Sequence, residues 1–294
     1  MTNMKQKLVL ALLCLAVCLC GVSVAEEISV CGLTVPPDAT LIDFDAAGIH
    51  VTDEKALGKA IEQLPLLTEV RMYNSELPKA SKEWLFDTYP DVFFGFTLRF
   101  AKHEVRTDAE AFSTLHTSDL DFQTDDYDHN QKELCLLRMC TRLKALDIGH
   151  NSATDLSFLS GLTELRVLIL GPNYYIEDIS PLASLTKLEY LELFSTKVRD
   201  ISALSGMENL RDLNLANSKR LKDLSPIYDL PSLERFWGGM CKFTSAQEKE
   251  MEKLHPGCEF DWYNGPTGGT WRLHPRYLII NRMFTTGVYI PFEE

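Results

Sequence analysis

The sequence lacks the residue spacings that zinc sites and disulfide scaffolds require. Of its eight cysteines, three lie within the first 25 residues, and the other five are too few to cross-link a chain of 294 residues. The core must therefore come from apolar burial. Neither a Cys-x-x-Cys nor a His-x-x-x-His pair occurs, so zinc has none of its usual ligand patterns. A pair of Cys258 with His255 shows no third orienting group. We therefore predict no catalytic residue, no metal site and no cofactor, and hence a protein that is not an enzyme.

Basic residues are also scarce. The formal net charge is −13 at pH 7, and residues 1–25 contain two lysines and no acidic residue. Without them, 29 − 2 = 27 basic residues face 42 acidic ones, which gives −15. Nucleic acids are bound by clustered Lys and Arg that neutralise phosphates, and a surplus of carboxylates repels a polyanion. The composition therefore argues against nucleic acid and anionic membrane surfaces as partners.

Long apolar runs are missing except at the N-terminus. Lys5 and Lys7 precede an apolar run over residues 8–19, which is short for a membrane span and is followed by the small residues Ser23 and Ala25. This pattern is typical of a cleavable secretory signal peptide. We expect cleavage after Ala25, a secreted or extracytoplasmic chain, and no membrane insertion of the mature part. A lipoprotein is the alternative, although the residues before its two candidate cysteines are not small.

The centre of the chain contains a repeat. Four copies of Leu-x-x-Leu-x-Leu-x-x-Asn follow one another at steps of 22, 23 and 22 residues, with Ile, Thr or Ser at some positions. Their middle residues are Leu146, Leu168, Leu191 and Leu213. A unit this short cannot bury its own apolar face, so the fixed period indicates a stack of coils that bury one another.

Each copy predicts a short strand followed by a turn. The alternating leucines mark a strand with one buried side, and the side chain in the Asn column can hydrogen-bond the backbone where the chain leaves the strand. Cys241 takes this position one step later and is predicted to be a structural thiol, with a Cys241–Cys258 bridge as the alternative. The column consists of Asn151, Asn173, Thr196, Ser218 and Cys241.

Residues 134–241 resemble the leucine-rich repeat. The pieces DLSFL, DISPL, DISAL and DLSPI, which begin at Asp155, Asp178, Asp200 and Asp223, resemble the internalin-type subclass of bacterial surface proteins. The resemblance implies an α/β leucine-rich-repeat solenoid, curved, with parallel strands on its concave face and helices or 3-10 turns on its convex face. It also implies a secreted or surface module that binds a protein in recognition or adhesion, without naming that partner.

The same register extends less regularly in both directions. Further strands are expected near Phe44, Val70, Phe96, Leu120 and Phe260. Helical patterns begin at Asp53, Ser81 and Asn130.

These patterns divide the chain into four parts. They are a signal peptide (1–25), degenerate N-terminal repeats with convex helices (26–142), regular repeats (143–241) and a C-terminal coil with a cap (242–294). An open stack exposes its core at the end, so the cap is expected to cover that end. Its candidate residues are Trp271, Tyr277, Ile279, Ile280 and Phe284.

The binding surface is predicted from the alternation of side chains along each strand. Residues on either side of the central leucine should point into the concave surface. They are largely acidic in the first half of the chain, whereas the second half adds aromatic side chains, which often make binding hot spots. Tyr174 and Tyr175 are expected on the rim of this surface. The predicted ligand-binding residues are Ile169, Tyr190, Glu192, Phe194, Asn214, Arg235 and Trp237.

Two other functions compete with this interpretation. A secreted hydrolase could use Asp119 and Asp121 as acid and base, and a structural envelope component would need no ligand at all. Calcium binding in residues 119–130 is disfavoured, because counting from Asp121 puts Asp126 and Lys132 where an EF-hand loop needs Gly and Glu.

Overall fold

The computed structural model describes residues 27–100, 103–115, 131–268 and 270–293. The expected signal peptide and the acidic stretch 119–130, which includes Leu120, lie outside these residues. The chain forms two compact units that divide between Phe94 and Gly95. That division falls inside the region 26–142, which the repeat pattern treats as one part.

The first unit contains a hairpin, two helices and the strands of a three-stranded sheet, the last of which ends at the boundary residue Gly95. Its elements are β1 (Ile28–Val30), β2 (Leu33–Val35), β3 (Leu41–Asp43), α2 (Glu54–Ile61), β4 (Glu69–Arg71), α3 (Lys79–Thr88) and β5 (Phe93–Gly95). Strands β3, β4 and β5 pair in that order, and β1 and β2 form an antiparallel hairpin. Asp53 caps α2, because one of its carboxylate oxygens accepts the N–H groups of Lys55 and Ala56 at 3.0 and 2.9 Å. The helices predicted from Asp53 and Ser81 are confirmed.

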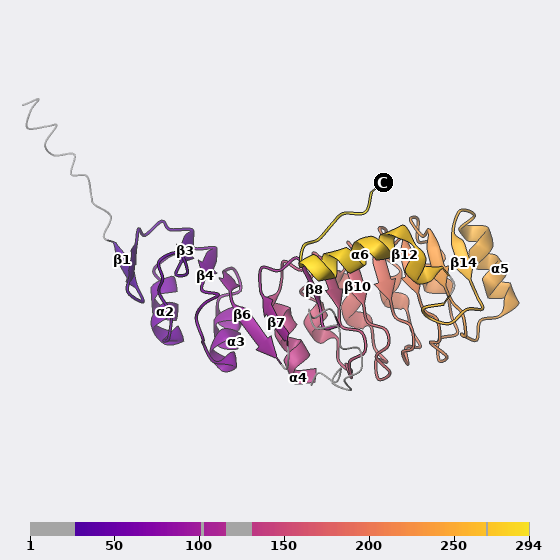
Figure 1. The fold of residues 1–294 in the computed structure, drawn as a ribbon, viewed down its shortest axis with the longest axis horizontal. Helices are drawn as coiled ribbons and strands as arrows, with labels where there is room; N and C mark the ends of the chain where they lie inside the picture. The colour runs from indigo at the N-terminus through magenta and orange to yellow at the C-terminus, as the bar shows by residue number, and fades with distance from the viewer. Residues whose placement is uncertain (1–26, 101–102, 116–130, 269, 294) are drawn as a thin grey trace, which may run out of the picture. The chain divides into compact units, whose positions relative to one another are not determined.

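The second unit contains the regular repeats. Its strands are β6 (Thr97–Phe100), β7 (His103–Arg106), β8 (Ala111–Ser113), β9 (Ala145–Asp147), β10 (Val167–Ile169), β11 (Tyr190–Glu192), β12 (Asp212–Asn214), β13 (Arg235–Trp237) and β14 (Glu259–Asp261). Strands β8 to β14 form one parallel sheet in sequence order (Figure 1). The central residues align, with Leu168 opposite both Leu146 and Leu191. Phe260 pairs with Phe236, so the predicted further strand is confirmed.

Short turns and helices connect these strands or follow the last of them. They are α4 (Gln131–Leu134), η1 (Cys135–Met139), η2 (Ser157–Leu159), η3 (Ser180–Ser184), η4 (Ser202–Leu204), η5 (Ser225–Ile227), α5 (Ser245–Leu254), η6 (Trp271–Leu273) and α6 (Pro275–Thr286), where η denotes a 3-10 helix. Each Asp-x-Ser piece starts such a turn, since its aspartate accepts the backbone N–H of the serine two residues later at 2.7 to 2.9 Å. The helical pattern predicted from Asn130 corresponds to α4 and η1.

The Asn column binds the backbone as predicted. Asn173 is buried, donates to the carbonyls of Ile148 and Leu170 at 2.8 and 2.6 Å, and accepts the N–H of Ala153 at 3.1 Å. Cys241 continues the column, with its Sγ atom 3.2 Å from the carbonyl of Leu215. Cys241 is therefore a structural thiol. The alternative bridge is not present, because both Cys241 and Cys258 are free.

The start of the seven-stranded sheet differs from the expected register. Phe112 in β8 pairs with Leu146, so it occupies the column that precedes the regular repeats. Phe96, expected at a strand centre, lies between β5 and β6. Strands β6 and β7 then form an antiparallel hairpin, which no repeat predicts. The two strands of a hairpin hydrogen-bond to each other and need no neighbouring coil, so the repeat period does not predict them.

The C-terminal segment, defined as residues 266–292, does not cap the end of the stack. Figure 1 shows α6 lying across the strands from β12 toward β8, while α5 lies at the β14 end. A helix of 12 residues is about 18 Å long, and four strand spacings of about 4.8 Å span roughly 19 Å. The expectation that these residues cover the open end is therefore wrong, because they cover a face of the sheet.

Candidate functional site: the outer sheet face

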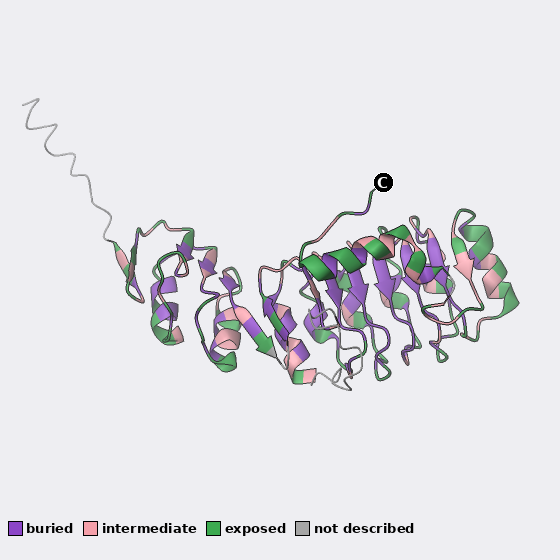
Figure 2. Ribbon diagram, in the orientation of Figure 1, coloured by how far each residue is buried: buried purple, intermediate pink, exposed green. Residues whose placement is uncertain are grey.

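The outer sheet face consists of the side chains of β8 to β14 that flank the central column and point away from the leucine core. All seven predicted ligand-binding residues are buried, with exposed fractions of 0 to 4%. Figure 2 shows the strands beneath α6 as buried, whereas much of α6 itself is exposed. The prediction that these side chains are exposed is wrong, because the C-terminal segment covers them. Burial in the free chain concerns only their exposure and not their ability to contact a partner.

Trp271 contacts the aromatic part of the face. Its ring centroid lies 5.5 Å from that of Tyr190 and 5.1 Å from that of Trp237. The guanidinium of Arg235 lies 4.5 Å from the Trp271 ring centroid, which is cation–π distance. Trp271 is fully buried, so the predicted hot-spot aromatics bind an aromatic side chain of the same chain.

Glu192 is the polar centre of this contact. It accepts hydrogen bonds from the Trp271 indole N–H at 2.9 Å, from Arg272 at 2.8 Å and from the Tyr190 hydroxyl. A buried carboxylate requires such partners, since leaving it unpaired costs several kcal/mol. Burial, followed by the nearby charge of Glu192, raises the pKa of Tyr190 well above its ordinary value, so the phenol keeps its proton.

Asp212 makes a second charged contact one strand further on. It receives two hydrogen bonds from Arg276, at 2.6 and 2.9 Å, and Arg276 also binds Glu234. The Asp212 side chain is completely buried, and that of Arg276 is 13% exposed. Burial opposes the positive charge of Arg276, but Asp212 and Glu234 outweigh it and raise the pKa of the guanidinium.

The β8 to β10 half of the face is largely apolar, apart from the buried Asp147. Ala111 and Ala145 leave room for a helix to approach their strands, and Val167 and Ile169 continue the surface. From the C-terminal segment, this cluster receives Ile280, Met283, Phe284 and Phe292. Helix α6 therefore places its charged start on the acidic strands and its apolar end on the apolar strands.

The chain beyond α6 is also bound. The backbone carbonyl of Gly287 accepts the N–H of Ala111 at 3.3 Å. The Tyr289 ring lies 5.7 Å from Lys144 and 5.9 Å from Arg166, and its backbone N–H donates to Glu110 at 3.4 Å. At the opposite end of the segment, Asn214 donates to the carbonyl of Pro266 at 2.8 Å.

Two buried donors on β13 are not satisfied by the segment. The indole N–H of Trp237 has no hydrogen-bond partner among the described residues. One terminal nitrogen of Arg235 lies 3.5 Å from Asp212 but does not meet hydrogen-bond geometry. Unsatisfied buried donors cost about 1–3 kcal/mol each, so the segment fits the face less well here than at Glu192 or Asp212.

Asp147, on β9, is a third buried carboxylate of the outer sheet face. It accepts the Gly149 N–H at 2.9 Å and the Ser113 hydroxyl at 3.1 Å. Burial raises its pKa from 3.8 to about 6, and the negative charge of Glu192 adds to the effect while Arg272 opposes it. Asp147 therefore changes charge near pH 6.

The sequence contains a signal for these contacts that the repeat pattern does not reveal. Residues 265–292 include Arg272, Arg276 and Arg282 but no acidic residue, in a chain with a large acidic surplus. The complementary carboxylates, Glu192 and Asp212, flank the central leucines of β11 and β12, so the alternation of the strands puts them on this face. It does not identify their partners, because 80 and 64 residues separate them from Arg272 and Arg276.

The acidic face expected in the first unit is partly neutralised. Arg71 forms ion pairs with Glu69 at 2.8 Å and with Asp43 at 3.4 Å. The two carboxylates proposed for a hydrolase, Asp119 and Asp121, lie outside the described residues.

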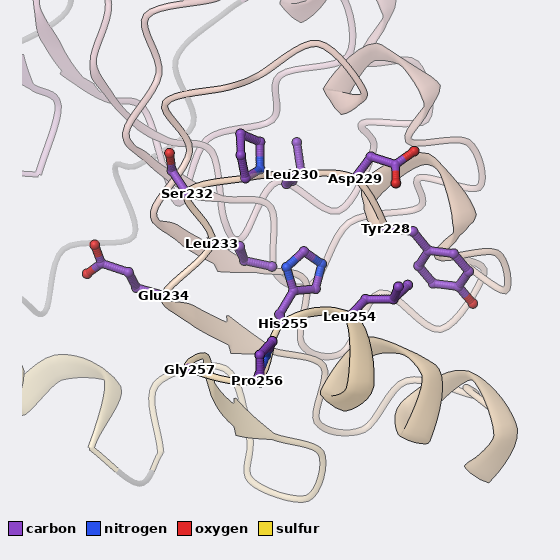
Figure 3. Close-up of a pocket in the computed structure, with 11 residues that line it drawn as sticks. Tyr228, Asp229, Leu230, Ser232, Leu233, Glu234, Leu254, His255, Pro256 and Gly257 are labelled. Atoms are coloured by element: carbon purple, nitrogen blue, oxygen red, sulfur yellow. The ribbon is translucent and has the colours of Figure 1, made fainter.

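A pocket is present between residues 228–234 and residues 254–257 (Figure 3). His255 lies among Leu230, Leu233 and Leu254 in this view, and burial lowers its pKa. No group of three His, Cys, Asp or Glu side chains within the described ranges is placed to hold a metal ion. The same ranges contain no helix that is long and apolar enough to cross a membrane.

Comparisons with known proteins agree on the repeat. Residues 186–229 match the family model described as leucine-rich repeats in two copies. Together with the stacked coils, this match shows a leucine-rich-repeat fold with a seven-stranded parallel sheet. No curated protein matches the sequence.

Several solved structures are similar to this chain. An internalin of Listeria monocytogenes is 18% identical, with 79% of this chain and 58% of that chain covered and a TM-score of 0.42. Internalin C2 of the same species is 20% identical, with 70% and 74% covered and a TM-score of 0.39. A leucine-rich-repeat protein of Leptospira interrogans is 20% identical, with 69% and 51% covered and a TM-score of 0.41. The chain thus spans little more than half the length of the first and third.

Proposed function

We propose that this chain is a secreted or surface protein-binding module, not an enzyme, and that its binding surface is the outer sheet face. One observation carries the proposal: the face already holds a helical segment through buried aromatic contacts and paired charges. Trp271 contacts Tyr190 and Trp237, and Arg276 pairs with Asp212. These are the aromatic and arginine contacts that dominate protein interfaces. The seven predicted residues would contact a partner once the C-terminal segment has moved aside.

Secretion rests on the pattern of residues 1–25, with two lysines, an apolar run and small residues before the expected cleavage site. The resemblance to internalin-type repeats favours recognition or adhesion at a bacterial surface. N-terminal sequencing of the exported protein tests this part. A mature chain that begins at Glu26 would support it, and an uncleaved chain retained in the cell would contradict it.

The binding surface is tested with the full mature chain and two double variants. Trp271→Ala/Arg276→Ala removes both main contacts of the C-terminal segment and should expose the face. Tyr190→Ala/Trp237→Ala changes the face itself. A displayed library of helical peptides should be enriched by the first variant and much less by the second. The proposal fails if the variant with the weakened segment enriches nothing beyond what wild-type protein enriches.

A second surface is favoured by exposure. Tyr174 and Tyr175 are 61% and 54% exposed, as expected for the rim, and the Lys197 ammonium lies 4.8 Å from the Tyr175 ring. Tyrosines brought together by one turn suit a protein interface that leaves the C-terminal segment in place. Peptide or protein binding that is lost in Tyr174→Ala/Tyr175→Ala, and kept in Tyr190→Ala/Trp237→Ala, would move the site to this rim.

A further inference from the structure

The C-terminal segment contacts the outer sheet face through three residues that lie close together in the sequence. Trp271 lies between Tyr190 and Trp237, Arg272 binds Glu192, and Arg276 binds Asp212. The two arginines are four residues apart and reach carboxylates on neighbouring strands, β11 and β12. The face thus has a binding group for each of three side chains: an aromatic residue, an arginine one residue after it, and an arginine five residues after it.

The matching groups distinguish arginine from lysine and tryptophan from phenylalanine. Asp212 receives two hydrogen bonds from one guanidinium, at 2.6 and 2.9 Å, a geometry that a lysine ammonium cannot reproduce. Glu192 accepts the indole N–H of Trp271 at 2.9 Å, and phenylalanine has no such donor. The face therefore discriminates between similar side chains, which an apolar groove does not.

The segment is connected to the sheet by a short stretch of chain that contains glycines. Strand β14 ends at Asp261, and the sequence from there to Trp271 contains three glycines, Gly265, Gly268 and Gly269. A segment held by such a short connection acts as a competitor at an effective concentration of about 1 mM. Any external ligand of the same face must outcompete it, which lowers the apparent affinity of that ligand.

We propose, on the basis of the proposed function, that the outer sheet face recognises a segment of a partner protein that folds as a 3-10 turn followed by a helix and carries an aromatic residue, preferably Trp, followed by Arg at the next and the fifth position. The chain's own residues Trp271, Arg272 and Arg276 occupy that site as an internal substitute for the partner. The partner segment is basic, in keeping with the buried carboxylates of Glu192 and Asp212.

The probe for this proposal is a fluorescent synthetic peptide of residues 266–293. It is titrated against wild-type protein, Trp271→Ala/Arg276→Ala, and the control Arg282→Ala, whose arginine is on the exposed side of α6. If the attached segment and the peptide both bind the face with a Kd of about 1 μM, an effective concentration of about 1 mM of the attached segment lowers the apparent affinity of the peptide by roughly 1000-fold. We expect the double variant to bind the peptide at least about 100-fold more tightly than the wild-type and control proteins. Equal binding by all three proteins would overturn the proposal.

Peptide variants test the chemistry. Replacing Arg276 of the peptide by Lys should weaken binding by about 10-fold, and replacing Trp271 by Phe should weaken it several-fold, because each loses hydrogen bonds to a buried carboxylate. Replacing Arg282 by Lys should change little. If all three peptides bind alike, the face does not distinguish these residues, and the assignment of the partner class is wrong.

A second measurement covers the case in which the double variant fails to fold. A protease site inserted after Thr267 in the otherwise wild-type chain allows the segment to be cut while it stays bound. Isotope-labelled peptide should then replace the cut segment, as followed by native mass spectrometry, while the repeats stay folded by circular dichroism. Unfolding of the repeats whenever the segment leaves would make the segment part of the folding core and overturn the proposal.

Selection from the displayed peptide library with the double variant Trp271→Ala/Arg276→Ala tests this proposal and the proposed function separately. Peptides enriched by the double variant that share the aromatic residue and the two arginines support both. Enrichment of peptides without them would keep the face as a binding surface and reject this partner class. Absence of enrichment would reject both.

Discussion

Arg276 and Asp212 are joined by two hydrogen bonds, of 2.6 and 2.9 Å, across 64 residues of sequence. Asp212 is completely buried and lies on the fourth of the five central strands, β9 to β13. The pair fixes the start of α6 on the acidic part of the outer sheet face, and from there the helix runs over the apolar part. This ion pair is one of several contacts, with those of Trp271 and Arg272 to Glu192, that hold the C-terminal segment on this face.

The first prediction follows from that pair. Arg276→Ala removes both hydrogen bonds of the ion pair from the buried carboxylate of Asp212, so the free energy of unfolding at pH 7 should fall by about 3 kcal/mol. Arg276→Lys should lose less, because one charge remains without the paired hydrogen bonds. Chemical denaturation measures both. Arg282→Ala, an exposed arginine of the same helix, should stay within about 0.5 kcal/mol of wild type. Equal losses at Arg276 and Arg282 would contradict the ion pair.

The second prediction concerns Trp237, expected from the sequence to be an exposed binding residue and found to be 1% exposed. Trp237→Ala should lower the free energy of unfolding by about 3–5 kcal/mol, because it opens a cavity next to Trp271. Trp237→Phe should cost only about 1 kcal/mol, since the indole N–H has no hydrogen-bond partner to lose among the described residues.

The control for this series is Tyr263→Ala, because Tyr263 is 86% exposed. It should change the free energy of unfolding by about 0.5 kcal/mol or less. A Trp237→Ala protein as stable as the Tyr263→Ala protein would show that the C-terminal segment does not cover the face in solution.

The third prediction tests the Asn column. Asn173→Ala removes two donated hydrogen bonds and one accepted one, all to buried backbone groups, so we expect a loss of about 3 kcal/mol in the free energy of unfolding. Asn209→Ala is the matched control, since exposed Asn209 makes a single hydrogen bond to the carbonyl of Thr186. A loss at Asn173 no larger than that at Asn209 would mean that the column does not hold neighbouring coils together.

The fourth prediction is a pH dependence. The pKa of Asp147 is about 6 in the folded chain and 3.8 ordinarily, so between these values the folded state binds more protons than the unfolded state. The free energy of unfolding contributed by this group is therefore highest at low pH and falls as the pH rises through 4 to 6. At about 1.4 kcal/mol per pKa unit, the difference amounts to roughly 3 kcal/mol above pH 6.

Asp147→Asn should remove this contribution, because the amide has the same shape and carries no charge. Its free energy of unfolding should vary less between pH 4 and 6 than that of wild type, and it should be higher than wild type at pH 7. Asp200→Asn serves as control, since exposed Asp200 has its pKa lowered by hydrogen bonds from Ser202. A slope between pH 4 and 6 that is the same in Asp147→Asn and wild type would rule out this assignment.

The repeats were predictable because their cause is local. Each coil needs the same leucines at the same step to bury its neighbour, so the columns of Leu168 and Asn173 are visible as a period in the sequence. The strand at Phe260 and the thiol at Cys241 followed from the same register, and the helix after Asp53 followed from a local helical pattern. The β6–β7 hairpin was not predictable in this way, because it has no counterpart in any other coil.

The alternation of side chains in a strand determined which residues leave the leucine core, and those residues, Tyr190, Glu192 and Trp237 among them, were identified correctly as members of one face. Alternation states only which side of the sheet a residue occupies, and says nothing about what packs against that side. Only the tertiary structure decided this, because Trp271, Arg272 and Arg276 meet the face across 64 to 80 residues through contacts that have no period. The repeated core could therefore be predicted from the sequence. The packing of the C-terminal segment on the outer sheet face could not, because it depends on individual long-range contacts that match in charge and shape.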